Sequence, residues 1–412
     1  MTDPWFIFIE SNTSGTGRLF ARTARDLGCR PALFTMSPGR YSYVAEEGVE
    51  VRIVSGYALE TLLEAAQDLA AERLIAGVYS SSEYFIGAAA GLARALGLPG
   101  PDPVATNICR NKREQRFALA DSLTPRFTSI RSSTELDECA KTIEFPVVIK
   151  PICGTGSSGV RLCANAIELL DFGRRLLAAT VNERGMPIPA EILVEEYLDG
   201  PEFSVEMFDG QVVGITRKHL SAEPFFVEVG HDYPAPVDSG VRSCIETRAR
   251  QAVASLGVGW GPSHVELRVV NGRANIIEIN PRLAGGFIPS LVRIATGIDL
   301  IRNTLARAMG RQVDLAPTQP QGAALRFILA TAQGVFADIR GLDDAAAIPG
   351  VCEVSTYRLA GERLSIHGDF RDRIGHIIAA GPTANVAAEV ADRAIRMIRP
   401  VIAREGTAAG IP

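Results

Sequence analysis

Short apolar runs and longer stretches with helical spacing alternate along the first 105 residues. The apolar runs predict strands at residues 5–10, 31–37 and 74–80. Apolar residues recur every three to four positions elsewhere, which predicts helices at residues 17–28, 57–72 and 84–97. This alternation is typical of an α/β layer with a parallel sheet. Gly15 and Gly17 follow the first strand without a third glycine, so they favour the wall of a cleft over a dinucleotide site.

The segment HVELRVVNGRANIIEIN predicts two strands joined by a tight turn. Its turn is Asn271-Gly272, and Asn-Gly between alternating apolar residues is a strong hairpin signal. Alternation places Glu266 and Arg268 on one face of the first strand. It places Glu278 and Asn280 on one face of the second strand. We therefore expect these polar side chains to converge.

The carboxylate of Glu278 and the amide of Asn280 need a physical reason inside the apolar run IIEIN, because an uncompensated buried carboxylate is costly. Glu266, Glu278 and Asn280 supply two carboxylates and an amide, which suit a hard cation such as Mg²⁺. Arg282 follows the second strand, so a structural ion pair is the alternative. We favour the metal site.

A glycine-rich hairpin is predicted after the apolar strand VVIK, which ends at Lys150. The segment Gly154–Gly159 matches GxGxxG, but VRLC continues as a strand where a Rossmann motif needs a helix. Backbone N–H groups of such a loop can close over phosphates while Lys150 reaches them. The alternative is a surface hairpin. Lys112 begins a helix after a proline-rich boundary, and that basic helix is either solvated or a phosphate contact.

The segment ILVEEYLDGPE predicts a connection between two lobes. Its buried strand runs into Glu195, Glu196, Tyr197 and Leu198, and Glu202 opens the next strand after a turn. Backbone groups there can meet an adenine edge, with Glu202 on ribose hydroxyls.

Taken in this order, the motifs resemble the ATP-grasp superfamily of carboxylate–amine ligases. The segments FVEVGHDYPAPV and NPRLAGGFIP make the sequence most similar to the L-amino-acid ligases, which form dipeptides or amides. The resemblance implies an ATP-grasp fold of mixed α/β and α+β class. We expect a Rossmann-like domain over residues 1–105, an ATP-grasp domain over 106–310 with a lid at about 120–200, and a small C-terminal α+β domain over 311–412.

The resemblance also implies a role for each matched residue, with ATP and Mg²⁺ or Mn²⁺ as cofactors. Phosphate contacts are implied for Lys112 and Lys150, covered by Gly154, Gly156, Ser157, Ser158 and Gly159. Adenine contacts are implied for Glu195, Glu196, Tyr197 and Leu198, and a ribose contact for Glu202. Metal binding is implied for Glu266, Glu278 and Asn280, catalysis for Lys150, Arg282 and Gly285, and substrate binding for Glu228, His231, Arg282, Gly285 and Gly286.

The composition and charge of the chain argue against some classes of binding partner. The chain of 412 residues is 47% hydrophobic and 22% charged, and its net charge of −5 argues against nucleic-acid and anionic-membrane partners. No apolar run approaches the ~20 residues of a membrane helix. Seven scattered cysteines without a CxxC pair indicate reduced thiols in a cytoplasmic protein. We expect a small carboxylate and an amine as partners, and a homodimer stays open.

Several assignments remain open on the sequence. His264 shares a strand face with Glu266 and either supports the metal ligands or packs in the core. His231 is either a substrate contact or a turn residue, and Gly285-Gly286 either lines a pocket or only turns the chain. Lys218 lies outside every matched motif, so we expect its substitution to have little effect. No role is assigned to Arg326, His367 and His376.

Three rival functions share these residues. They are a carboxylase of the biotin type, a ligase with a hydroxy or polyamine acceptor, and a non-catalytic ATP-binding module. The last is disfavoured because a pure sensor needs neither the metal ligands nor Arg282.

Overall fold

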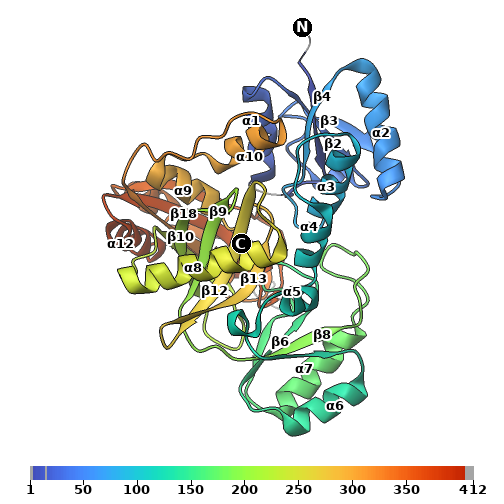
Figure 1. The fold of residues 1–412 in the computed structure, drawn as a ribbon. Coiled ribbons are helices and arrows are strands. Elements are labelled where there is room, and N and C mark those ends of the chain that lie inside the picture. The colour runs from blue at the N-terminus through green and yellow to red at the C-terminus, as the bar shows by residue number, and fades with distance from the viewer. Residues whose placement is uncertain (1–2, 14–15, 404–412) are drawn as a thin grey trace.

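The computed structural model describes residues 3–13 and 16–403. Gly15, one residue of the incomplete dinucleotide motif, lies outside these ranges. Along the chain a small parallel sheet is followed by the antiparallel sheet of a lid and then by a body built on a large antiparallel sheet (Figure 1). No helix of the described residues is both long enough and apolar enough to span a bilayer.

A four-stranded parallel sheet of order β3-β2-β1-β4 forms the N-terminal layer, as the alternation predicts. The edge strand β3 was not predicted, because EVRI is short and only partly buried. The elements of this layer are β1 (Trp5–Ile9), α1 (Thr16–Asp26), β2 (Arg30–Thr35), β3 (Glu50–Ile53), α2 (Leu59–Glu72), β4 (Ile75–Tyr79) and α3 (Ile86–Ala95).

Two short helices lead from this layer into the lid, which is a four-stranded antiparallel sheet of order β5-β8-β6-β7 with two helices (Figure 1). Asn111 caps the second of the short helices by accepting from two backbone N–H groups, which fixes where Lys112 begins. The elements are α4 (Pro103–Arg110), α5 (Lys112–Ala118), β5 (Phe127–Ile130), α6 (Ser133–Thr142), β6 (Val147–Pro151), β7 (Arg161–Cys163), α7 (Ala166–Ala178) and β8 (Ile192–Glu196).

An eight-stranded sheet of order β13-β12-β9-β10-β11-β14-β18-β16 forms the body. Strands β14, β18 and β16 lie beyond residue 311, so the sheet continues from the predicted ATP-grasp region into the C-terminal region. The elements are β9 (Glu202–Phe208), β10 (Gln211–Leu220), β11 (Glu228–Tyr233), α8 (Ser239–Leu256), β12 (Pro262–Val270), β13 (Arg273–Asn280), α9 (Ile288–Thr296), α10 (Leu300–Ala308), β14 (Gly322–Leu329), β16 (Val351–Thr356) and β18 (Arg373–Gly381).

The remaining C-terminal elements form a three-stranded sheet of order β17-β15-β19 with helices beside it. The spacing of apolar residues over 385–403 predicts one helix across this whole segment, and that prediction is wrong. The helix ends at Ile395 and residues 399–403 form a strand, because Pro400 cannot continue a helix. The elements are β15 (Gly334–Arg340), α11 (Leu342–Ala346), β17 (Arg363–Leu364), η3 (Phe370–Asp372), α12 (Ala384–Ile395) and β19 (Arg399–Ala403).

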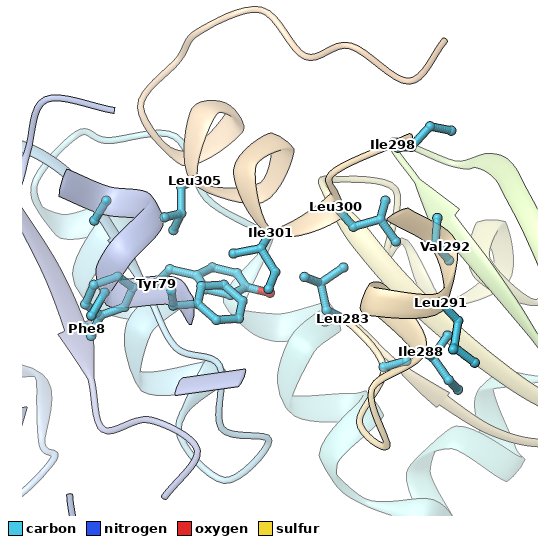
Figure 2. Packing of buried hydrophobic residues seen from close by; sticks show 14 of the residues in the cluster. Phe8, Tyr79, Leu283, Ile288, Leu291, Val292, Ile298, Leu300, Ile301 and Leu305 are labelled. Carbon is cyan, nitrogen blue, oxygen red and sulfur yellow. The ribbon is translucent and has the colours of Figure 1, made fainter. Parts of the chain in front are cut away.

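An apolar cluster joins the N-terminal layer to the body (Figure 2). Phe8 and Tyr79 from the parallel sheet, Leu305 from α10 and Leu291 from α9 belong to one buried group. Leu283 belongs to the same group and is 8% exposed. Because Leu283 follows Arg282 directly, this packing holds the backbone at Arg282 in place.

Candidate active site

A cleft of about 890 Å³, including its open mouth, is lined by the lid, the eight-stranded sheet and one residue of the N-terminal layer. It brings together most of the predicted site residues. Those that line it are Lys112, Lys150, Gly154, Gly156, Ser157, Ser158, Glu195, Glu196, Tyr197, Leu198, Glu202, Glu228, Glu266, Glu278, Asn280 and Arg282. Four predicted residues do not line it: Gly159, His231, Gly285 and Gly286.

A buried carboxylate faces two cations on the lid side. Lys150 Nζ lies 2.5 Å from Glu195 Oε2, and Arg116 Nε donates to Glu195 Oε1 at 2.9 Å. Burial lowers the pKa of Lys150 to about 8 against the attraction of Glu195, and Arg116 lowers it further by repulsion. One positive charge is therefore in excess, which suits an incoming anion. Arg116 belongs to the basic helix that begins at Lys112, and its side chain is fully buried, so this residue is not a solvated base.

The glycine-rich hairpin is confirmed between β6 and β7. Gly156 has φ +62°, and a Cβ there would lie 2.5 Å from Phe370 Cδ1, so glycine is needed at this position. Ser157 Oγ donates to the carbonyl of Phe226 at 2.8 Å, and the Phe370 N–H donates to Gly156 O at 3.2 Å. Lys112 Nζ donates to Gly154 O at 3.1 Å. The loop thus lies over Lys112 and touches the C-terminal region.

Strands β12 and β13 place the predicted metal ligands side by side. Glu266 lies opposite Glu278, and His264 lies opposite Asn280. Two carboxylates and an amide fit Mg²⁺ in donor chemistry. No three His, Cys, Asp or Glu side chains within residues 3–13 and 16–403 form a metal-binding group by themselves.

His264 is buried and contacts the predicted metal ligand Glu266 directly. Its Nε2 lies 3.0 Å from Glu266 Oε1, and its Nδ1 lies 3.1 Å from Glu206 Oε2. Burial opposes a charge on the ring, but Glu206 and Glu266 raise the pKa of His264 to about 9. A charged ring donates to both carboxylates and orients Glu266.

The structure places Lys218, which lies outside every matched motif, among three carboxylates of the cleft. Its side chain on β10 is 2% exposed, and its Nζ lies 2.9 Å from Glu202, 2.8 Å from Glu228 and 3.0 Å from Glu266. Burial opposes its charge, yet these three carboxylates raise the pKa of Lys218 well above 10.5. Lys218 thus links the carboxylates of Glu202, Glu228 and Glu266 on one side of the cleft.

Arg282 is held by an acid that sequence reasoning missed. Glu83, between β4 and α3, pairs with Arg282 Nη2, and Arg110 Nη1 lies 2.8 Å from the same carboxylate. Burial opposes ionisation of Glu83, but Arg282 and Arg110 lower its pKa to about 2. Arg282 Nη1 also donates to the carbonyl of Leu283 at 2.8 Å. The N-terminal layer therefore positions the guanidinium.

The two residues predicted to bind substrate in the segment Glu228–His231 lie differently: Glu228 lines the cleft, whereas His231 is buried behind it. Glu228 Oε2 lies 2.8 Å from Arg373 Nη2 and 3.3 Å from His231 Nε2. His231 is fully buried, and its Nδ1 lies 3.1 Å from Gly286 O. Gly286 has φ +59°, and a Cβ there would lie 2.6 Å from His231 Cε1, which supports the turn interpretation of this glycine. Gly285 is exposed and does not line the cleft, so its position does not support the catalytic role implied for it.

The far end of the cleft is a polar wall with aromatic neighbours. Arg268 Nη1 donates to the carbonyl of Leu198 at 2.9 Å, and Arg268 Nε lies 3.0 Å from Glu202. The same guanidinium lies 5.6 Å from the Tyr197 ring centroid and 5.1 Å from that of Phe226.

Lysine is rare in this sequence, and most of its lysines lie at the cleft. The sequence contains four lysines among its 42 basic residues, at positions 112, 141, 150 and 218. Three of the four contact carboxylates that line the cleft. The fourth, Lys141, is exposed on the lid and pairs with Glu138.

Two regions of the chain each match a known protein family. A family model described as an ATP-grasp domain matches residues 143–290, and one described as L-amino acid ligase C-terminal domain 2 matches residues 326–403. The uncharacterised protein y4rH of Sinorhizobium fredii is 36% identical over 395 residues, 95% of this chain and 82% of that protein. Alanine–anticapsin ligase of Bacillus amyloliquefaciens is 25% identical over 260 residues, 58% of this chain and 55% of that protein.

The fold has a counterpart among solved structures. The L-amino acid ligase from Bacillus licheniformis superposes with a TM-score of 0.82 at 23% identity, over 98% of this chain and 100% of that chain. Together with the cleft, these likenesses define the class: the chain belongs to the ATP-grasp superfamily of ATP-dependent ligases. Within that class it carries the C-terminal domain of the L-amino acid ligases.

Proposed function

We propose that the protein joins the carboxylate of an amino acid or related small acid to an amine, with ATP converted to ADP and phosphate. One observation carries this proposal: a single cleft holds an excess cation at Lys150, the oxygen donors Glu266 and Glu278, and Arg282. The likeness to an alanine–anticapsin ligase supports an amide product.

The nucleotide would lie between the lid and the sheet. Its phosphates would meet Lys112 and Lys150 beneath the loop 154–159, where an anion also relieves the repulsion between Lys150 and Arg116. Backbone groups from Glu195 to Leu198 line the cleft and suit an adenine edge, and Glu202 lies where ribose hydroxyls would follow.

Glu266, Glu278 and Asn280 would hold Mg²⁺ or Mn²⁺. A bound ion there neutralises charge on the phosphates and aligns them. His264 keeps Glu266 oriented through its 3.0 Å contact.

The chemistry proceeds in two steps. An oxygen of the substrate carboxylate attacks the γ-phosphorus of ATP, and the bond from this phosphorus to the bridging β–γ oxygen breaks. The products of this step are an acyl phosphate and ADP. The amine then attacks the acyl carbon, loses a proton, and inorganic phosphate leaves. Arg282, fixed by Glu83, stabilises the negative charge that develops on the acyl oxygen.

The release of phosphate from ATP should be measured in the presence of Mg²⁺ for many pairs of amino acids. The products should be identified by mass spectrometry. We expect release that requires both an acid and an amine, with an amide product in equal amount. Turnover that depends on bicarbonate and yields no amide would overturn the proposal in favour of a carboxylase.

A further inference from the structure

Two lysine ammonium groups contact the oxygen atoms that the proposed function assigns to a metal. Lys112 Nζ lies 2.8 Å from Glu278 Oε1, and Lys218 Nζ lies 3.0 Å from Glu266 Oε2. These contacts join the phosphate side of the cleft to its metal side.

Both ammonium groups carry a charge. Lys112 Nζ pairs with Glu278, and Lys218 Nζ pairs with Glu202, Glu228 and Glu266, so each ammonium group faces carboxylates that stabilise its charged form. A divalent cation approaching Glu266 or Glu278 therefore meets a positive charge about 3 Å from its ligands, in a site with little screening. In the absence of metal, the ammonium groups of Lys112 and Lys218 balance the charges of Glu278 and Glu266.

Each lysine has other polar partners besides the predicted metal ligand that it contacts. Lys112 Nζ also donates to Gly154 O, at the loop that would cover the phosphates. Lys218 keeps Glu202 and Glu228 when it leaves Glu266. A compact ammonium on a flexible stem changes partners more easily than a planar guanidinium, which gives a reason for lysine at these positions in an arginine-rich chain.

We propose that Lys112 and Lys218 are exchangeable counter-ions of Glu278 and Glu266, so that metal enters only together with nucleotide. The phosphates supply the negative charge that draws the ammonium groups from the carboxylates as the ion arrives. This inference rests on the proposed function and adds to it a coupling between the two ligands.

The variant Lys218→Met tests the exchange without removing any carboxylate. Each of the three carboxylates keeps another cation in the variant: Arg268 for Glu202, Arg373 for Glu228 and His264 for Glu266. The fold is therefore expected to persist. Lys112→Met tests the Glu278 side independently, and Lys141→Met, at an exposed lid position paired with Glu138, is the matched control.

The readout is Mn²⁺ binding to the nucleotide-free protein, followed by electron paramagnetic resonance. We expect weak binding by the wild type and by Lys141→Met, and binding about tenfold tighter or more in Lys218→Met, within the usual range of coupling between sites. Adding Glu278→Gln to Lys218→Met should abolish this gain.

The outcomes separate the two proposals. If Lys218→Met and Lys112→Met bind Mn²⁺ no more tightly than the wild type, the exchange is wrong while the proposed function stands. If Glu278→Gln leaves Mn²⁺ binding in the presence of a non-hydrolysable ATP analogue unchanged, the metal site itself is wrong, and the proposed function fails with it.

Discussion

Replacing Lys150 by methionine should make the nucleotide-free protein more stable while abolishing its use of ATP. The side chain is 4% exposed, and the pKa of Lys150 falls from 10.5 to about 8 on folding, mainly through burial. That fall corresponds to about 3 kcal/mol of cost for keeping the charge at neutral pH. Methionine has a similar shape and no charge, and Glu195 keeps Arg116 at 2.9 Å.

The sign of the pH dependence follows from the two pKa values. Below about pH 8 the lysine is charged in both the folded and unfolded states, so the full cost is present. Between about 8 and 10.5 the unfolded state binds the extra proton, so the stability of the wild type rises with pH towards that of the variant. The gap in stability should therefore be largest at pH 7 and close as pH rises.

Scanning fluorimetry at several pH values measures this gap, with Lys141→Met as the control that should melt like the wild type. We expect the Lys150→Met protein to melt several degrees higher at pH 7 and to lose the stabilisation that ATP gives the wild type. A variant that melts lower, by an amount independent of pH, would show that the Glu195 pair stabilises the fold and would refute the excess-charge argument.

Three further predictions address other parts of the cleft. Glu278→Gln should lower turnover by at least about 100-fold without unfolding the protein, because it removes a metal ligand's charge and keeps its shape; normal phosphate release would exclude Glu278 from the metal site. Gly286→Ala should cost about 1–3 kcal/mol of stability, since φ is +59° and the new Cβ would overlap His231; an unchanged melting temperature would contradict the turn interpretation. Hydrogen exchange at residues 154–159 should slow on nucleotide binding, and equally slow exchange without nucleotide would exclude a lid role for this loop.

The hairpin at Asn271-Gly272 shows what local sequence can predict. Both turn residues have positive φ, +50° and +73°, as a two-residue turn between twisted strands requires. Regular pairing from this turn would put Glu266 opposite Ile277, but a register shift between Glu266 and Leu267 puts it opposite Glu278 instead. The turn depends on neighbours in sequence and could be predicted, whereas the register shift that pairs the two carboxylates could not.

The partners of Arg282 and Lys218 could not be obtained in this way. Glu83 and Arg282 are separated by 199 positions and meet only because the N-terminal layer packs against α9 and α10. Lys218 meets three carboxylates from three different strands, β9, β11 and β12. The sheet order that brings these strands together is set by packing across the whole domain. The extension of the large sheet by β14, β18 and β16 was missed for the same reason.

The uneven placement of lysine also makes the protein easy to label. Lys141 on α6 is 65% exposed, whereas the Lys112, Lys150 and Lys218 side chains are 9%, 4% and 2% exposed. Among lysine side chains, an amine-reactive dye would therefore attach to Lys141, on the outside of the lid and away from the cleft. A fluorophore at this native position can report lid movement without the introduction of a cysteine.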